Sequence, residues 1–174
     1  MTAVHRTAEV DWAGSIARGS GLASGHSGAL SHLPITLASR LGEPEGKTSP
    51  EELIAAAHAG CFTMALGSIL ASQGTPPERL QVTATVTLET SGTPTIASSQ
   101  LEVHGVVPGA DAGAFDRAAH EAEQSCPVSR ALQGNVEIGV HATLDEPLVP
   151  STSADAAQPR RDTLLGGRGP ASGT

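Results

Sequence analysis

Two cysteines, Cys61 and Cys126, are the side chains of this 174-residue sequence whose types and positions suit redox chemistry. Cys61 lies in the middle of an apolar helical pattern, where burial is expected to raise the pKa of its thiol. Cys126 directly precedes Pro127, which marks the first position of a short helix, so its thiolate would face free backbone N–H groups. One buried thiol and one activated thiol are typical of a pair in which one sulfur becomes a sulfenic acid and the other condenses with it.

The two cysteines also have a simpler interpretation, as small apolar residues of the core. The first residues of the chain lack the apolar segment of a signal peptide, so we expect no export. Cysteines of a protein that stays in a reducing compartment are more often reactive thiols than a permanent disulfide. The surroundings of each cysteine favour the reactive interpretation.

A reactive Cys61 needs a cation beside it, because the helix dipole acts only over the end turns of a helix. Arg40, in the segment before the helix, is a permanent cation with a long reach. Glu52 has a local role in a capping box with Ser49, whereas Glu51 is free to pair with Arg40 and orient it.

The spacing along the helix separates these residues. Glu51 precedes Cys61 by ten residues, which corresponds to about 15 Å along an α-helix. One chain could bring Glu51, Arg40 and Cys61 together only by stretching Arg40 between the other two. We therefore expect a homodimer with the site at its interface, in which a second subunit supplies the missing member.

His58 lies three residues before Cys61, on the same helical face. We interpret it as a packed or hydrogen-bonded core histidine. A cysteine hydrolase with His58 as the base for Cys61 is a second hypothesis, but a pair three residues apart on one helix suits it poorly and leaves Cys126 unexplained. A metal site of Cys61, His58 and Cys126 is a third. A fourth is a dimeric small-molecule-binding module or redox sensor, whose thiols respond to oxidant without turnover.

The helix that carries Cys61 has a well-defined start and end. Ser49 is its predicted N-cap, Pro50 its first residue, and Gly74 follows its end. Apolar residues recur at helical spacing, and the opposite face is Ala and Gly rather than charged. We therefore predict a helix over residues 50–72 that is buried nearly all round.

The other helices and strands are predicted from the alternation of apolar and polar residues and from turn-forming residues. We predict strands at residues 8–12, about 28–37, 80–88, 96–107 and 136–144, with a bulge or a break between 96 and 101. Residues 14–27 suit a hairpin or irregular loop, and residues 38–48, including Arg40, a loop. A helix follows Asp111 and ends near Gln124. These elements predict an α+β fold with an antiparallel or mixed sheet behind the helices.

Composition narrows the range of partners. The formal net charge of -8 argues against a nucleic-acid partner. No apolar run reaches the roughly 18 residues that span a bilayer, so we expect a cytoplasmic protein without a membrane partner. Residues 147–174 are rich in Ser, Thr, Ala, Pro, Gly and Arg, and we predict a disordered low-complexity tail.

Two long segments, residues 48–66 and 125–132, resemble the OsmC/Ohr family of thiol peroxidases, and within it the OsmC branch. Weaker matches lie at residues 12–19, 39–43 and 107–111. The resemblance covers about residues 5–145 in order. Residues 1–146 are therefore interpreted as one OsmC-like peroxidase domain, followed by the tail.

This resemblance implies an α+β, OsmC-like fold with antiparallel or mixed sheets packed around a long central helix. It implies an intertwined homodimer with two active sites at the subunit interface. The implied activity is reduction of organic hydroperoxides, and less efficiently of hydrogen peroxide, in oxidative-stress defence. No metal, flavin or other cofactor is implied. The dithiol reductant of the family is often a lipoylated protein.

The resemblance also implies site residues by position. Cys61 matches the peroxidatic cysteine and Cys126 the resolving one, with a Cys61–Cys126 disulfide between them. Glu51 matches the family glutamate, and Arg40 the arginine of the OsmC branch. In the Ohr branch the arginine lies near Arg18, so either arginine is a candidate. The apolar surroundings of Cys61 predict a preference for alkyl hydroperoxides over hydrogen peroxide.

Overall fold

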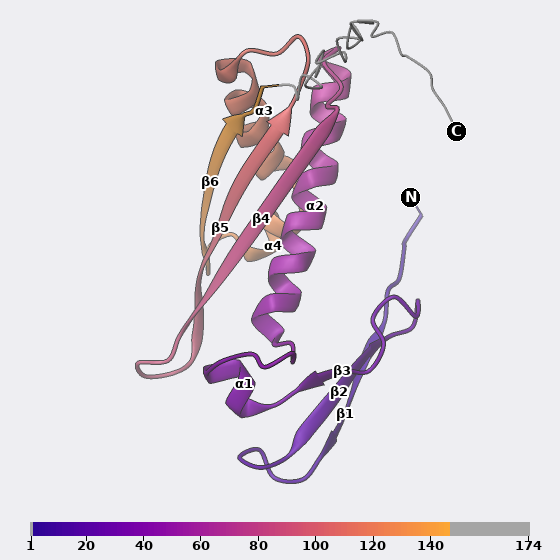
Figure 1. Ribbon diagram of the computed structural model, residues 1–174, viewed down its shortest axis with the longest axis vertical. Helices are drawn as coiled ribbons and strands as arrows, with labels where there is room; N and C mark the ends of the chain where they lie inside the picture. The colour runs from indigo at the N-terminus through magenta and orange to yellow at the C-terminus, as the bar shows by residue number, and fades with distance from the viewer. Residues whose placement is uncertain (1, 147–174) are drawn as a thin grey trace, which may run out of the picture.

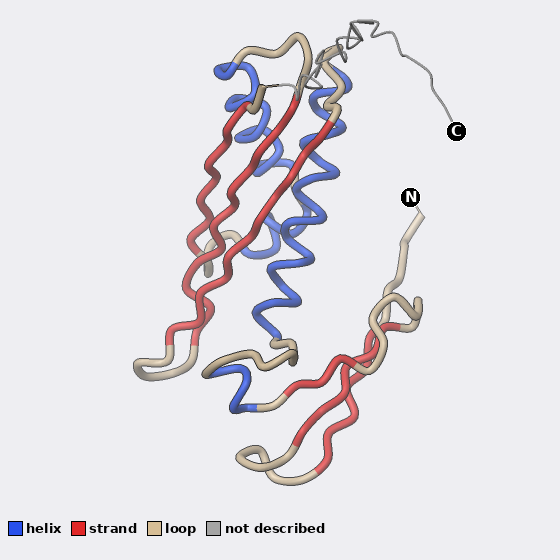
Figure 2. The backbone as a smooth tube through the Cα atoms, viewed as in Figure 1, coloured by secondary structure: helices blue, strands red, loops and turns tan. Residues whose placement is uncertain are grey.

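The computed structural model describes residues 2–146 as two small sheets and four helices. In Figure 1 one sheet packs with helices α2, α3 and α4, and the N-terminal sheet lies away from it, joined through α1. The tube view in Figure 2 shows the same separation of the two sets of strands. The chain therefore has a mixed α+β architecture. The predicted tail, residues 147–174, lies outside the described residues.

The N-terminal sheet consists of β1 (Ala8–Ala13), β2 (Ser20–Gly25) and β3 (Leu33–Ile35), paired in antiparallel order. The strand predicted at residues 8–12 is confirmed. The segment predicted as a hairpin or loop contains β2, and the strand predicted over residues 28–37 shortens to three residues. The sequence did not predict β2, because Gly and Ser residues have a low strand propensity. Their backbone can nevertheless form hydrogen bonds to a strand on either side.

The second sheet consists of β4 (Arg79–Glu89), β5 (Thr95–Val106) and β6 (Glu137–Leu144). β4 and β5 are antiparallel, whereas β5 and β6 are parallel, so the sheet is mixed. The register shifts where Thr87 pairs with Ser98 and Leu88 with Ile96, which leaves Ala97 as the extra residue. The predicted bulge between residues 96 and 101 is therefore confirmed.

The parallel pairing of β6 requires a crossover, which α3 (Ala112–Ser125) and α4 (Pro127–Leu132) provide. Asp111 caps α3 as predicted, accepting a hydrogen bond from the Ala114 N–H at 2.7 Å. The core lies between the sheet and the helices (Phe62, Leu66, Leu70, Leu101, Val103, Phe115, Ala118, Ala119 and Ala122). Side-chain space is tight there, and a side chain at Gly105 would collide with the ring of Phe115.

Helix α2 (Pro50–Ser72) begins at its predicted residue. The Ser49 hydroxyl accepts from the Glu52 N–H at 3.1 Å, which confirms the N-cap. The second half of the predicted capping box is wrong, because the Glu52 carboxylate accepts from the Thr48 hydroxyl at 2.7 Å instead. At the other end Gly74 has a φ of 82°, in the left-handed region that favours glycine.

The burial predicted for α2 is wrong for a single chain. One face packs on β4, α3 and α4 and buries His58, Phe62, Leu66 and Leu70. On the outer face Met64 is 72% exposed. Against expectation, α2 is also long and apolar enough to cross a membrane by length and composition, with a mean hydropathy of 1.7. That is weak evidence, because a helix that packs in a protein core passes the same test.

Candidate functional site

Arg40 and Glu51 form an ion pair at the start of α2. The Arg40 Nε lies 3.1 Å and 3.2 Å from the two Glu51 carboxylate oxygens, and its Nη2 lies 2.7 Å from Oε1. Two donors meet one carboxylate, which fixes the plane of the guanidinium. The predicted pairing of Glu51 with Arg40 is thus confirmed.

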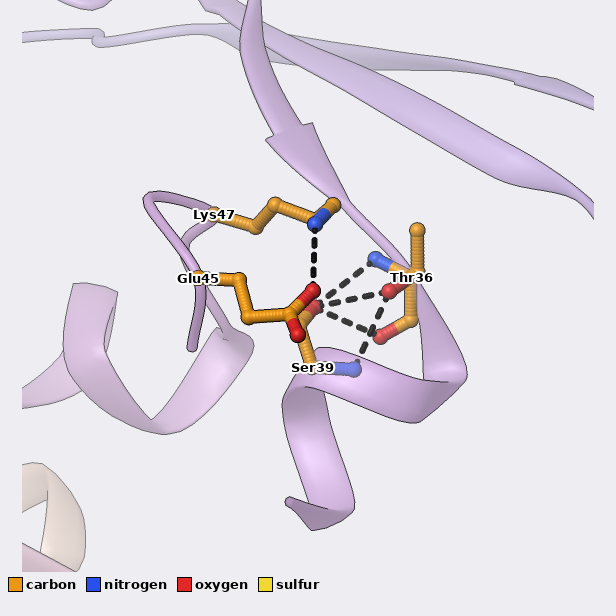
Figure 3. Close-up of polar contacts among 4 residues, drawn as sticks. All are labelled: Thr36, Ser39, Glu45 and Lys47. Carbon is orange, nitrogen blue, oxygen red and sulfur yellow. Dashed lines mark hydrogen bonds and ion pairs between the residues drawn. The ribbon is translucent and has the colours of Figure 1, made fainter. Parts of the chain in front are cut away.

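Arg40 lies on a helix that the sequence analysis placed in a loop. This helix, α1 (Leu37–Leu41), has Thr36 as N-cap and Ser39 as the third helical residue. Figure 3 shows their reciprocal bonds, in which the Ser39 N–H donates to Thr36 Oγ1 at 3.0 Å and the Thr36 N–H to Ser39 Oγ at 3.3 Å. The usual signal has Glu or Gln in place of this Ser, which explains why the prediction missed the helix.

The loop from α1 to α2 carries a second pair, in which the Lys47 Nζ lies 3.4 Å from the Glu45 carboxylate (Figure 3). Beside it lies an open cavity of about 580 Å³, lined by Arg40 and Glu51 on one side and by residues 84–88 of β4 on the other. Neither cysteine lines this cavity. The arginine–glutamate pair therefore faces an open space rather than a thiol of its own chain.

Glu51 is 8% exposed, yet it remains a carboxylate. Burial by itself raises the pKa of Glu51, but hydrogen bonds from Arg40 and the backbone outweigh burial and hold the pKa below its ordinary value of 4.5. The same hydrogen bond raises the pKa of Arg40, against the effect of burial. Both groups are therefore charged at neutral pH.

The two cysteines come together where α2 passes the start of α4. Cys61 is partly exposed, Cys126 is fully buried at the N-cap of α4, and both thiols are free. The two thiols are close enough for each to affect the pKa of the other. The predicted N-cap position of Cys126 is confirmed. Its sulfur makes no capping hydrogen bond.

The surroundings of the two sulfurs differ in their effect on ionisation. Burial raises the pKa of Cys61, and the neighbouring Cys126 raises it further, against a smaller effect of the Val128 N–H. Burial also opposes ionisation of Cys126, but bonds from Ser129, Cys61 and Val128 outweigh it and lower the pKa of Cys126. Within residues 2–146 Arg40 is not among the groups that bear on Cys61.

His58 is a buried, hydrogen-bonded core histidine, as predicted. Its Nδ1 lies 2.7 Å from the Ser99 hydroxyl of β5, and its Nε2 lies 2.9 Å from the Ser129 hydroxyl of α4. Burial lowers the pKa of His58, so the ring is neutral at neutral pH. Because both nitrogens face serines, His58 is not placed as the base for Cys61. In the described part of the chain no three His, Cys, Asp or Glu side chains form a metal-binding group.

The sequence analysis missed both serines of this network. Ser129 follows Cys126 by three residues, in the first turn of a short helix, so its proximity to the sulfur has a local signal. Ser99 has none, because it precedes Ser129 by thirty residues and meets His58 only through the packing of β5 on α2. Strand alternation indicates that Ser99 faces inward, but not which helix residue it contacts.

The fold and the site together define a class: an α+β protein with two neighbouring free thiols and a separate arginine–glutamate pair. The family model described as "OsmC-like protein" matches residues 42–141. The chain is 38% identical to "Peroxiredoxin OsmC" of Escherichia coli (strain K12) over 136 residues, which cover 78% of this chain and 94% of that protein. The chain therefore belongs to the OsmC family.

Further relatives and solved structures agree with this family. The chain is 34% identical over 109 residues to an "Organic hydroperoxide resistance protein-like" protein of Staphylococcus aureus, which covers 59% of this chain and 74% of that protein. The structure superposes on the organic hydroperoxide resistance protein OhrB of Bacillus subtilis with a TM-score of 0.64 at 26% identity, covering 79% of this chain and 98% of that chain. The shared fold thus extends over nearly the whole OhrB chain.

Proposed function

We propose that this protein is a cysteine-based peroxidase that reduces organic hydroperoxides in oxidative-stress defence. Cys61 attacks the peroxide O–O bond and becomes a sulfenic acid, with release of the alcohol. Cys126 then condenses with it to a Cys61–Cys126 disulfide and water, and a dithiol reductant, such as a lipoylated protein, restores both thiols. The observation that carries this proposal is the pair of free, neighbouring thiols, with Cys126 in the buried core and Cys61 packed against that core.

Exposure supports Cys61 as the sulfur that meets peroxide. Cys126 has the lower pKa of the two, but it is fully buried, whereas Cys61 is partly exposed on α2. A peroxide can approach only the exposed sulfur without opening the core. Cys61 therefore reacts first, provided that a cation brings its thiol to the thiolate form.

That cation comes from a second subunit in our proposal. Within residues 2–146 no arginine bears on Cys61, and Arg40 and Glu51 face an open cavity. The outer face of α2 is also apolar, and the described part of the chain leaves Met64 on it 72% exposed. A homodimer would cover this face and bring the guanidinium of one subunit to the Cys61 of the other. A fully active monomer in gel filtration would contradict this arrangement.

The proposal includes a cytoplasmic location and a preference for organic over inorganic peroxide. Two free thiols suit the cytoplasm, where dithiol reductants keep cysteines reduced. The apolar residues around Cys61 on α2, among them Ala65 and Met64, form one wall of the peroxide site and favour alkyl hydroperoxides. Comparable rates with cumene hydroperoxide and hydrogen peroxide would count against this preference.

A thiol count tests the core of the proposal. Reduced protein is mixed with a single equivalent of cumene hydroperoxide, and free thiols are counted beside Cys61→Ser and Cys126→Ser. Loss of both thiols in the unmodified protein, with no rapid peroxide consumption in Cys61→Ser, is the expected result. Repeated turnover with a dithiol such as dihydrolipoamide distinguishes a peroxidase from a redox sensor. Two thiols that survive the peroxide would overturn the proposal.

A further inference from the structure

Met64 is the most exposed sulfur-containing residue within residues 2–146, and the proposed reaction does not use it. This part of the chain contains three sulfur atoms, those of Cys61, Met64 and Cys126. Cys126 is fully buried and Cys61 is partly exposed, whereas Met64 is 72% exposed. A thioether has no proton to lose, so its oxidation by a peroxide depends on access and not on a pKa.

The neighbours of Met64 on the surface of α2 are too small to cover it. Residues three and four positions away are neighbours on an α-helix, and around Met64 these are Gly60, Cys61, Gly67 and Ser68. A Cβ atom at Gly60 would meet nothing within 4 Å, and Ser68 is itself exposed. The described residues therefore leave the thioether open to a peroxide.

Met64 also lies beside the sulfur that the proposed reaction uses. It follows Cys61 by three residues on α2, which places two Cβ atoms about 5–6 Å apart. A hydroperoxide that approaches the exposed side of Cys61 therefore also meets the thioether. The same stretch of α2 belongs to the apolar face that a second subunit covers in the proposed homodimer. Oxidation of Met64 would thus change the polarity of that interface.

We propose that Met64 is a second oxidation site of this protein, where an organic hydroperoxide converts the thioether to methionine sulfoxide and thereby weakens the homodimer. The terminal peroxide oxygen is transferred to the sulfur, so the O–O bond breaks and the S=O bond forms. The sulfur loses two electrons, and the hydroperoxide is reduced to its alcohol, which takes up the peroxide proton. No further reactant is needed. This inference rests on the homodimer of the proposed function.

The weakening follows from the polarity of the product. A sulfoxide on a covered apolar face loses its hydration and has no hydrogen-bond donor to replace it, which opposes association. A two-fold interface uses the same surface of both subunits, so each oxidised dimer carries two sulfoxides. Dissociation separates the Arg40 of one subunit from the Cys61 of the other. Oxidation of Met64 therefore switches off peroxide reduction when hydroperoxide is in excess.

The first test measures association without thiol chemistry, in a chain that carries both Cys61→Ser and Cys126→Ser. This chain is treated with excess tert-butyl hydroperoxide, and peptide mapping by mass spectrometry locates the added oxygen. Sedimentation equilibrium then gives the dissociation constant of the dimer. We expect oxygen at Met64 and a dissociation constant about tenfold higher, because the sulfoxide is buried without a partner.

Met64→Leu in the same background is the matched control. Leucine keeps the volume and the apolar character of the side chain but takes up no oxygen. Its association should be the same before and after treatment, whereas oxidation at Met1 or elsewhere would affect both chains alike.

The second test changes the polarity directly and reverses it. Met64→Gln carries a polar amide on a side chain of similar length, so it should weaken association about tenfold without any peroxide. Methionine sulfoxide reductases with a dithiol should return the oxidised chain to its original dissociation constant, because they reduce both sulfoxide epimers. General damage by peroxide would not be reversed.

Several outcomes overturn the inference. An oxidised chain that associates as before would do so, as would treated peptide without oxygen at Met64, or a Met64→Leu chain that loses association on the same treatment. A chain that is a monomer before treatment overturns the proposed homodimer and this inference together. The thiol count on the unmodified protein still decides separately whether Cys61 reduces peroxide.

Discussion

The Arg40–Glu51 pair and the polar cluster of His58, Ser99 and Ser129 each include one residue of α2, yet they differ in completeness. The His58 cluster is closed within one chain, since each ring nitrogen lies within hydrogen-bonding distance of a serine hydroxyl. In the arginine–glutamate pair Glu51 is buried, but 34% of the Arg40 side chain is open to solvent beside a cavity. One chain therefore completes the His58 cluster beside the start of α4, but leaves the arginine–glutamate pair open.

This difference explains an apparent conflict in the thiol chemistry. Neighbouring groups lower the pKa of Cys126, whereas burial above all raises that of Cys61, although Cys61 is the proposed site of attack. The conflict disappears if the cation for Cys61 belongs to a second subunit, because a guanidinium close to a thiol favours its thiolate. Substitutions in the two clusters and at the cysteines test this explanation.

The largest effect is expected for Cys61→Ser, which removes the attacking sulfur. Peroxide consumption should fall about a thousandfold or more, because a serine hydroxyl remains protonated and does not cleave the O–O bond. Cys126→Ser should still consume peroxide once per chain and then stop at the sulfenic acid. Stopped-flow assays of both variants with cumene hydroperoxide measure this. Rapid consumption by Cys61→Ser would show that the buried Cys126 reacts first.

The next effect is expected for Arg40→Met, which removes the cation but keeps much of the apolar stem. Consumption of peroxide should slow about 10²- to 10³-fold, the usual range for loss of a preorganised electrostatic group. Arg18→Met is the matched control, since Arg18 is the arginine that the structure does not pair with Glu51. A larger loss in Arg18→Met than in Arg40→Met would reverse the assignment.

Mixing variants tests whether the arginine acts across subunits. When Cys61→Ser and Arg40→Met chains are unfolded together and refolded in equal amounts, half of the dimers are mixed. Each mixed dimer then has one intact site, so about a quarter of the original activity should return. If Arg40 serves the Cys61 of its own chain, every site carries a defect and no activity returns.

A smaller effect is expected for Glu51→Gln, which keeps the shape but loses the charge that orients Arg40. The rate should fall about tenfold, as a charge-assisted pair becomes a neutral one. Because the pKa of Glu51 is lowered in the folded protein, its stabilising contribution is present above 4.5 and is lost as the pH falls through the lower folded value. Thermal unfolding against pH should therefore show a weaker acid dependence in Glu51→Gln. An identical acid dependence would contradict the buried ion pair.

The smallest effect on chemistry is expected for Ser49→Ala, at the start of α2. Loss of the bond from the Glu52 N–H should lower the free energy of unfolding by about 1 kcal/mol. The rate of peroxide consumption should remain within about twofold, because this cap holds the helix rather than the reactive groups. Denaturant unfolding beside the stopped-flow assay measures both. A large rate loss at unchanged stability would give Ser49 a role in orienting Glu51.

The sequence by itself determined the features that depend on neighbours along the chain. Ser49 and Pro50 start α2, Asp111 caps α3, and Cys126 with Pro127 starts α4, because capping uses groups within three residues. Alternation placed β4, β5 and β6 and their bulge, since each strand has one inward face. The pairing of Arg40 with Glu51 also followed, because Glu52 had a partner nearby and Glu51 had none.

Only the tertiary structure decided the features that join distant segments. The parallel pairing of β6 with β5 has no local signal, because both pairings bury the same face. Packing of β5 and α4 on α2 brings Ser99 and Ser129 to the two nitrogens of His58. The tertiary structure also leaves one face of α2 exposed, whereas the apolar composition of this helix predicted burial all round. The burial of a helix depends on the elements that pack against it and not on its sequence alone.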